Sequence, residues 1–180
     1  GVDGSGVYGA GQTGGILPGQ IGSGGEDAFI RKYVTSGNEV WTQQFGGPDQ
    51  DSINAIFVGA SGVYVAGFME ENALVRQYGL NGNEILNLVF GTASADGAFA
   101  ISVDATGIYV AGGTSGTLPG QVSAGGTDAF VRKYDFNGNA LWTHQFGTRG
   151  FDGATGVAVD ASGVYRAGVQ GGGLGGEESY

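Results

Sequence analysis

The 180-residue sequence contains no cysteine, which excludes disulfides, thiolate metal sites and cysteine nucleophiles. It has one histidine and only 7 lysines and arginines against 17 acidic residues, so its formal net charge is −10. An acidic surface repels phosphate groups, and we therefore expect no nucleic-acid partner. No apolar run approaches the roughly 18 residues that a membrane-spanning helix requires, so no membrane insertion is expected.

Glycine is abundant instead, with 40 residues, a content that approaches the low-complexity range. The glycines recur at fixed offsets, however, and apolar and aromatic runs such as "AIFVGASGVYVAGF" (55–68) lie between them. Disordered segments lack such apolar content. The composition therefore favours a folded, glycine-rich repeat protein.

The repeat is visible in two segments, "GGEDAFIRKYVTSGNEVWTQQFG" (24–46) and "GGTDAFVRKYDFNGNALWTHQFG" (125–147), which agree at 15 of 23 positions. A second motif, Gly-Val/Ile-Tyr, begins at residues 6, 62, 107 and 163, and "FG" ends each hairpin-like segment at Phe45, Phe90 and Phe146. Each unit reads as four short strands, and Asn-Gly turns such as "FNGN" predict the hairpins between the last two. Repeats of this length with four strands each are typical of β-propeller blades.

We thus predict an all-β fold made of β-propeller blades of four antiparallel strands, with no helix longer than two turns. The expected units are a first blade lacking most of its inner strand (1–47), a second (48–92), a third (93–148) and a partial fourth (149–180). About three blades and a partial one do not make a closed ring of four to eight blades. We expect an open arc that belongs to a larger chain or to a homo-oligomer.

The string "GGTDAFVRKYDFNGNALWTHQFGTRGFDGATGVAVDASGVY" (125–165) resembles the SBBP repeat, the propeller repeat of bacterial and archaeal surface and secreted proteins. The resemblance covers nearly the whole chain and implies a propeller fold and an extracellular or cell-surface location. It implies little about activity, because one fold carries many functions.

The first candidate site is a set of aspartates six residues after each "FG" phenylalanine: Asp51, Asp96 and Asp152. They are predicted either to bind a cation or sugar hydroxyls on one face, or to accept backbone N–H groups within glycine-rich loops. For calcium, the alternating oxygen ligands of Asp49, Asp51 and Asn54 in "PDQDSIN" are the nearest approach to a known pattern. No other metal and no cofactor is expected.

Other recurring residues suggest structural roles. Asp27 and Asp128 are replaced by Asn72, and Asp104 and Asp160 by Gly59, so both positions are expected to belong to turns or strand starts. The recurring arginines (Arg31, Arg76 and Arg132) are expected to pair with carboxylates along each blade. His144, the one histidine, aligns with Gln43 and Leu88 of the other units. The sequence contains no Gly-x-Ser-x-Gly motif whose serine this histidine could activate, so no catalytic residue is predicted.

Three functions remain open at this point. The first is a non-enzymatic exported module for adhesion, scaffolding or protein binding, with a protein or glycan partner at the cell surface. The second is a carbohydrate- or calcium-dependent module that uses the aspartate loops. The third is a fragment of a propeller enzyme with its catalytic residues elsewhere. The "LPGQ" segments (17–20 and 118–121) are a further expected contact region, since binding residues are frequent on loops of rigid scaffolds.

Overall fold

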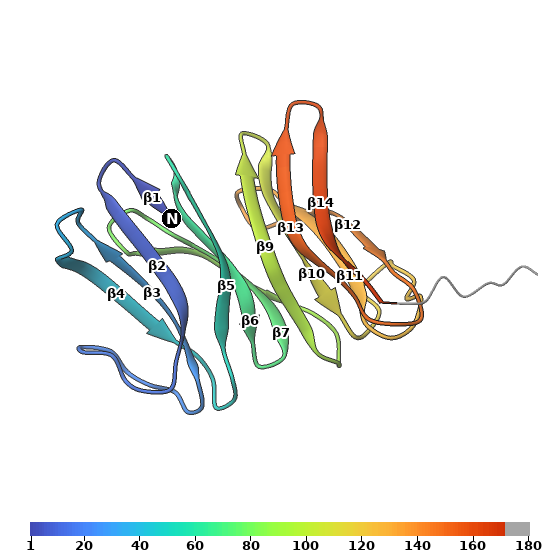
Figure 1. Ribbon diagram of the computed structural model, residues 1–180, viewed down its shortest axis with the longest axis horizontal. Helices are drawn as coiled ribbons and strands as arrows, with labels where there is room; N and C mark the ends of the chain where they lie inside the picture. Colours follow the sequence, from blue (N-terminus) through green and yellow to red (C-terminus); the bar gives the residue numbers. More distant parts are fainter. Residues whose placement is uncertain (172–180) are drawn as a thin grey trace, which may run out of the picture.

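The computed structural model describes residues 1–171, and all of their regular structure is β-strand (Figure 1). The strands form four sheets, and every pair of neighbouring strands within a sheet is antiparallel. No helix that could cross a membrane occurs in this part of the chain. The prediction of an all-β fold with repeated four-stranded sheets is confirmed.

Each sheet is a meander in which the strands follow one another in sequence order. The first sheet contains β1 (Val2–Asp3), β2 (Gly6–Thr13), β3 (Asp27–Tyr33) and β4 (Glu39–Phe45). The second contains β5 (Ser52–Gly59), β6 (Gly62–Met69), β7 (Asn72–Tyr78) and β8 (Glu84–Phe90). The third contains β9 (Asp96–Asp104), β10 (Gly107–Thr114), β11 (Asp128–Tyr134) and β12 (Ala140–Phe146), and the fourth contains β13 (Asp152–Asp160) and β14 (Gly163–Gln170).

The four sheets follow one another along the longest axis of the molecule (Figure 1). Their first strands meet near the middle, where β5 contacts β2 and β9, and β13 contacts β9 and β10. The apolar side chains of a single sheet cannot all be buried within it, so neighbouring sheets cover one another. The largest buried cluster accordingly joins the second and third sheets and includes Tyr64, Val75, Ile108 and Phe130.

The aromatic residues that recur in the repeats lie between sheets. The Trp41 ring of the first sheet lies 6.4 Å from that of Tyr78 in the second, measured between centroids. Phe90 of the second sheet lies 5.5 Å from Phe130 of the third. These contacts explain why aromatic residues recur: each belongs to the junction between one unit and the next.

Hairpins form after β3, β7 and β11, as the turn signals predict, with Asn-Gly in the second and third turns and Ser36-Gly37 in the first. Only the glycines have positive φ, 91° at Gly37, 87° at Gly82 and 86° at Gly138. The amide of Gly138 donates to Asp135 O, and the register between β11 and β12 shifts just before the turn. This is a type I turn followed by a bulge, in which one residue needs a left-handed backbone instead of two.

Candidate functional site

The recurring aspartates of the sequence motif lie at the start of the second, third and fourth sheets and are buried: Asp51 directly precedes β5, and Asp96 and Asp152 begin β9 and β13. Asp51, Asp96 and Asp152 expose 0%, 5% and 2% of their surface. Their backbone amides donate to carbonyl oxygens of the preceding unit, at 2.7 Å in each case. This position joins one sheet to the next and is not a ring of exposed carboxylates.

The carboxylates at these positions accept hydrogen bonds from their own loops. Asp51 Oδ2 accepts from the Gly47 amide at 2.6 Å, and its Oδ1 accepts from the Glu70 amide at 3.0 Å. Asp152 Oδ2 accepts from the amide and the hydroxyl of Thr148, at 2.6 and 3.0 Å. Thr92 holds Asp96 in the same way. The geometry therefore favours the structural interpretation of these residues over direct sugar binding.

A second carboxylate lies beside the first in two of the units. Asp128 Oδ2 accepts from the Ala124 amide and from Gln145 Nε2, at 3.0 and 2.7 Å, so this residue holds the start of β11 in place. Between the two carboxylates lies Gly147, where an added Cβ would stand 2.3 Å from Asp128 Oδ1 and 2.8 Å from Asp152 Oδ2. A side chain larger than that of glycine therefore has no room at this position of the "FG" motif.

The proposed calcium ligands do not converge. Asn54 Nδ2 donates to Ala98 O of the third sheet at 3.0 Å, whereas both oxygens of Asp51 are engaged by amides. Asp49 is exposed. Among residues 1–171, no three histidine or acidic side chains gather in a way that could hold a metal ion.

The aspartates before the Gly-Val/Ile-Tyr motif close turns, as the sequence predicts. Asp160 Oδ1 accepts from the amide and the hydroxyl of Ser162, and these hydrogen bonds lower the pKa of Asp160 below its usual value. At Asp104, burial opposes the shift, but the bonds from Thr106 lower the pKa overall. These residues stabilise turns in their ionised form.

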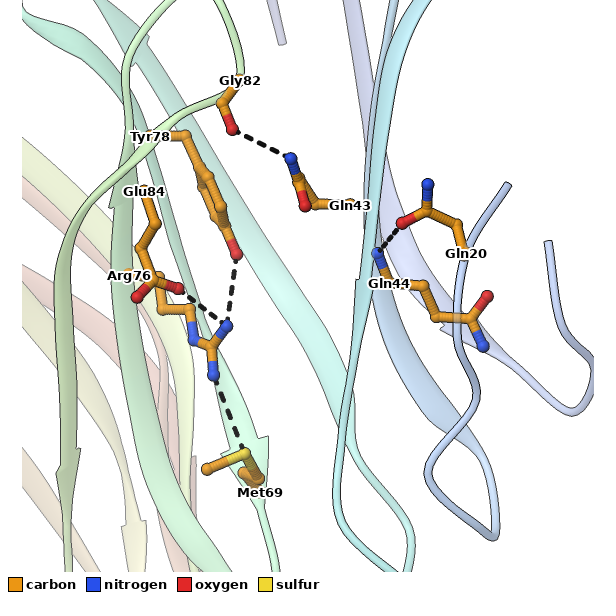
Figure 2. Close-up of polar contacts among 8 residues, drawn as sticks. All are labelled: Gln20, Gln43, Gln44, Met69, Arg76, Tyr78, Gly82 and Glu84. Atoms are coloured by element: carbon orange, nitrogen blue, oxygen red, sulfur yellow. Dashed lines mark hydrogen bonds and ion pairs between the residues drawn. The ribbon is translucent and has the colours of Figure 1, made fainter. Parts of the chain in front are cut away.

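The long connections between β2 and β3 (14–26) and between β10 and β11 (115–127), here named the LPGQ loops, are held by a glutamine pair. Gln44 Oε1 accepts from the Leu17 amide at 2.8 Å. The backbone amide of Gln44 donates to Gln20 Oε1 at 2.9 Å, a bond that Figure 2 shows. Gln145 makes the same two bonds with Leu118 and Gln121, each at 2.9 Å.

Each LPGQ loop also exposes an aliphatic side chain. Ile21 is 83% exposed and Val122, at the equivalent position, is 84% exposed. The second unit has neither the loop nor the glutamine, since Val89 replaces Gln44 and a tight turn connects β6 to β7. The glutamine is thus present where the loop is present.

The arginines form the predicted ion pairs in two of three units. Arg76 lies 2.9 Å from Glu84 and also contacts Tyr78 and Met69 (Figure 2), and Arg31 lies 3.4 Å from Glu39. In the third unit Ala140 stands at the place of Glu39 and Glu84, and Arg132 pairs with no carboxylate within residues 1–171. Two of these arginines stack on a phenylalanine of the preceding sheet, a contact that the sequence interpretation missed: Arg76 on Phe45 and Arg132 on Phe90.

His144 is exposed on β12 and lies 5.3 Å from the ring of Trp142. This is the place of an ordinary strand side chain.

No protein-family model matches the chain, and no curated protein matches it. The geometry of the LPGQ loops and of the surface beside them is therefore the basis for a functional assignment.

Proposed function

We propose that the four sheets are β-propeller blades of the SBBP type and that the chain is a non-enzymatic, exported module that binds a protein partner. The successive four-stranded meanders, their stacking through aromatic residues and the acidic composition support this proposal. The module would work as a rigid scaffold that presents loops.

The observation that carries the proposal is the pair of fixed LPGQ loops. Ile21 and Val122 are held in solvent by loops whose backbones bond to Gln44 and Gln145. A loop whose backbone is already ordered loses little conformational entropy when a partner covers it. Two equivalent aliphatic side chains on rigid loops are therefore suited to docking a protein surface.

A second contact region is the free side of β14. The equivalent strands β2, β6 and β10 are each paired with a third strand, whereas β14 pairs only with β13 among the described residues. Val164, Tyr165 and Val169 are accordingly 38%, 52% and 53% exposed. We propose that a further outer hairpin, from more blades of the same protein or from a second copy, adds to this edge.

The protein-binding proposal is tested by capture from the surface fraction of the source cells, followed by a comparison of variants. The double variant Ile21→Ser/Val122→Ser should lose the captured protein. Its control is Ile85→Ser/Leu141→Ser, which removes two other exposed aliphatic side chains, from β8 and β12. Equal capture by both double variants would refute the role of the loops.

A further inference from the structure

A groove of about 500 Å³ opens where the second, third and fourth sheets meet. Its lining includes Phe68 at the end of β6, Phe99 on β9 and Phe151 immediately before β13, together with Asp49 and Glu71. We name it the phenylalanine groove. Its volume lies in the range of sites that bind small molecules or single side chains.

The three phenylalanines come from three different positions of the repeat, and each occurs once. Glutamine and glycine (Gln12 and Gly113) replace Phe68 in other units, asparagine and threonine (Asn54 and Thr155) replace Phe99, and glutamine and alanine (Gln50 and Ala95) replace Phe151. A residue that builds the repeat recurs in it, so these three are not required by the architecture. Departures from the repeat that converge on one groove indicate a function of that groove.

Phe151 in particular is left 57% exposed. A phenylalanine ring at an open groove offers a face that attracts cations through its quadrupole. The groove therefore has an aromatic surface that the fold itself does not cover.

The charged groups of the groove are all of one sign. Asp49 and Glu71 are exposed, and neither carboxylate forms a hydrogen bond or an ion pair within residues 1–171. No lysine, arginine or histidine belongs to the lining. In a chain of net charge −10, this combination attracts a positively charged group and repels an anion.

The backbone that carries Glu71 is strained. Glu70 and Glu71 have φ values of 49° and 66°, in the left-handed region that residues other than glycine seldom adopt. The first and third units have an LPGQ loop here instead of this two-residue turn. The turn fixes Glu71 beside the groove, where its backbone carbonyl oxygen accepts a hydrogen bond from the Asp96 amide at 2.7 Å.

We propose that the phenylalanine groove binds the side chain of an arginine or lysine in a basic segment of the partner protein. This inference rests on the proposed protein-binding function and adds the chemistry of the partner. The groove is continuous with an LPGQ loop, since Ser115 and Thr127, at the two ends of that loop, belong to its lining. The guanidinium or ammonium group stacks on the phenylalanine rings, and the two exposed carboxylates pair with its charge.

The test uses the whole chain, isotope-labelled for NMR, and a short peptide in which glycine and serine surround one arginine. The matched probe is the same peptide with the uncharged isostere citrulline. We expect chemical-shift changes at Phe151 and Glu71 with a dissociation constant of about 1 mM, typical of one side chain. The citrulline peptide should bind at least about tenfold more weakly.

Two variants check the groove. Phe151→Ala should weaken binding of the arginine peptide about fivefold. Glu71→Gln should weaken it about threefold at low salt and less at high salt. Phe136→Ala is the control, because Phe136 is 43% exposed and lies in the turn after β11, outside the lining. Both test residues are exposed, so the fold should persist in these variants.

Several results would overturn the inference. Equal binding of the citrulline peptide or of a neutral oligosaccharide would show that charge is not recognised. Tighter binding of tetramethylammonium than of the arginine peptide would assign the groove to a small organic cation. Ile21→Ser/Val122→Ser changes no groove residue and should leave peptide binding unchanged, so failure of the loop proposal and failure of this inference are distinguishable.

Discussion

The guanidinium of Arg76 lies over the ring of Phe45 on the preceding sheet, with Cζ 3.7 Å from the ring centroid. The same contact recurs one unit later, where Arg132 Cζ lies 4.5 Å from the centroid of Phe90. At the fourth sheet Arg166, from a different strand position, covers Phe146 at 3.4 Å. The phenylalanine of each "FG" motif therefore binds an arginine of the next unit, and this contact links the sheets.

Arg76→Gln should lower the free energy of unfolding by about 1–2 kcal/mol, because it removes a buried cation–π contact and the pair with Glu84. Urea denaturation measures this change. Arg31→Gln is the matched control, since Arg31 has the equivalent pair with Glu39 but no ring of a preceding sheet beneath it among the described residues. Equal losses for both variants would contradict the linking role of the ring contact.

Gly147→Ala should destabilise the fold by about 3 kcal/mol, since the added methyl group would overlap the buried carboxylates of Asp128 and Asp152. Thermal unfolding followed by circular dichroism measures the loss. Gly9→Ala on β2 is the control, because an added Cβ there meets nothing within 4 Å. A Gly147 variant as stable as the Gly9 variant would show that the carboxylate pair is not held rigidly.

Gln145→Val should release the LPGQ loop 115–127 without unfolding the sheets. Valine is the residue that the second unit has at this position, and it cannot make the side-chain bonds of Gln145, which are accepted from the Leu118 amide and donated to Gly116 O and Asp128 Oδ2. Each lost hydrogen bond contributes about 1 kcal/mol to local stability. Hydrogen–deuterium exchange should become faster in the loop and stay unchanged in β9 and β10. Unchanged protection of the loop would show that Gln145 does not hold it in place.

We predict that the turn aspartates make the folded state less stable in acid. Because hydrogen bonds keep the pKa of Asp104 below its ordinary value of 3.8, its ionised form stabilises the folded state above the unfolded-state pKa. That contribution is lost as the pH falls through the lower, folded-state pKa. Asp104→Asn should therefore be less stable than the wild type at pH 7 and should lose less stability between neutral pH and pH values below about 4.

The control for the loss of these turn hydrogen bonds is Asp49→Asn, since the Asp49 carboxylate is exposed and accepts no hydrogen bond within residues 1–171. At pH 7 its unfolding free energy should equal that of the wild type. If the unfolding free energy of Asp104→Asn changes with pH in the same way as that of the wild type, Asp104 does not contribute to the acid sensitivity.

The fold could be predicted because its structural unit is repeated several times in the sequence. Apolar alternation and the returning Gly-Val/Ile-Tyr and "FG" motifs give strand positions that agree among units, so an error in one is corrected by the others. The Asn-Gly signal predicted the place of the turn after β11, in which only Gly138 has a positive φ. Sequence signals identify that a hairpin turns at Asn-Gly more securely than they identify its hydrogen-bonding class.

The candidate sites were harder to predict for a related reason. Asp51, Asp96 and Asp152 stood out because they recur, and recurrence reflects the architecture that buries them. Phe68, Phe99 and Phe151 occupy unrelated positions of three units, and only the stacking of the sheets brings them to one groove. A sequence signal for them did exist, because each departs from its own repeat position.

The central claim, that the LPGQ loops dock a protein partner, is tested most directly by the affinity of the purified partner for two double variants. Calorimetry should show that Ile21→Ser/Val122→Ser weakens binding at least about tenfold, as expected when apolar anchors at the centre of an interface are removed. Ile85→Ser/Leu141→Ser, with side chains 57% and 53% exposed on β8 and β12, should bind as the wild type does. Undiminished affinity of the loop variant would contradict the account.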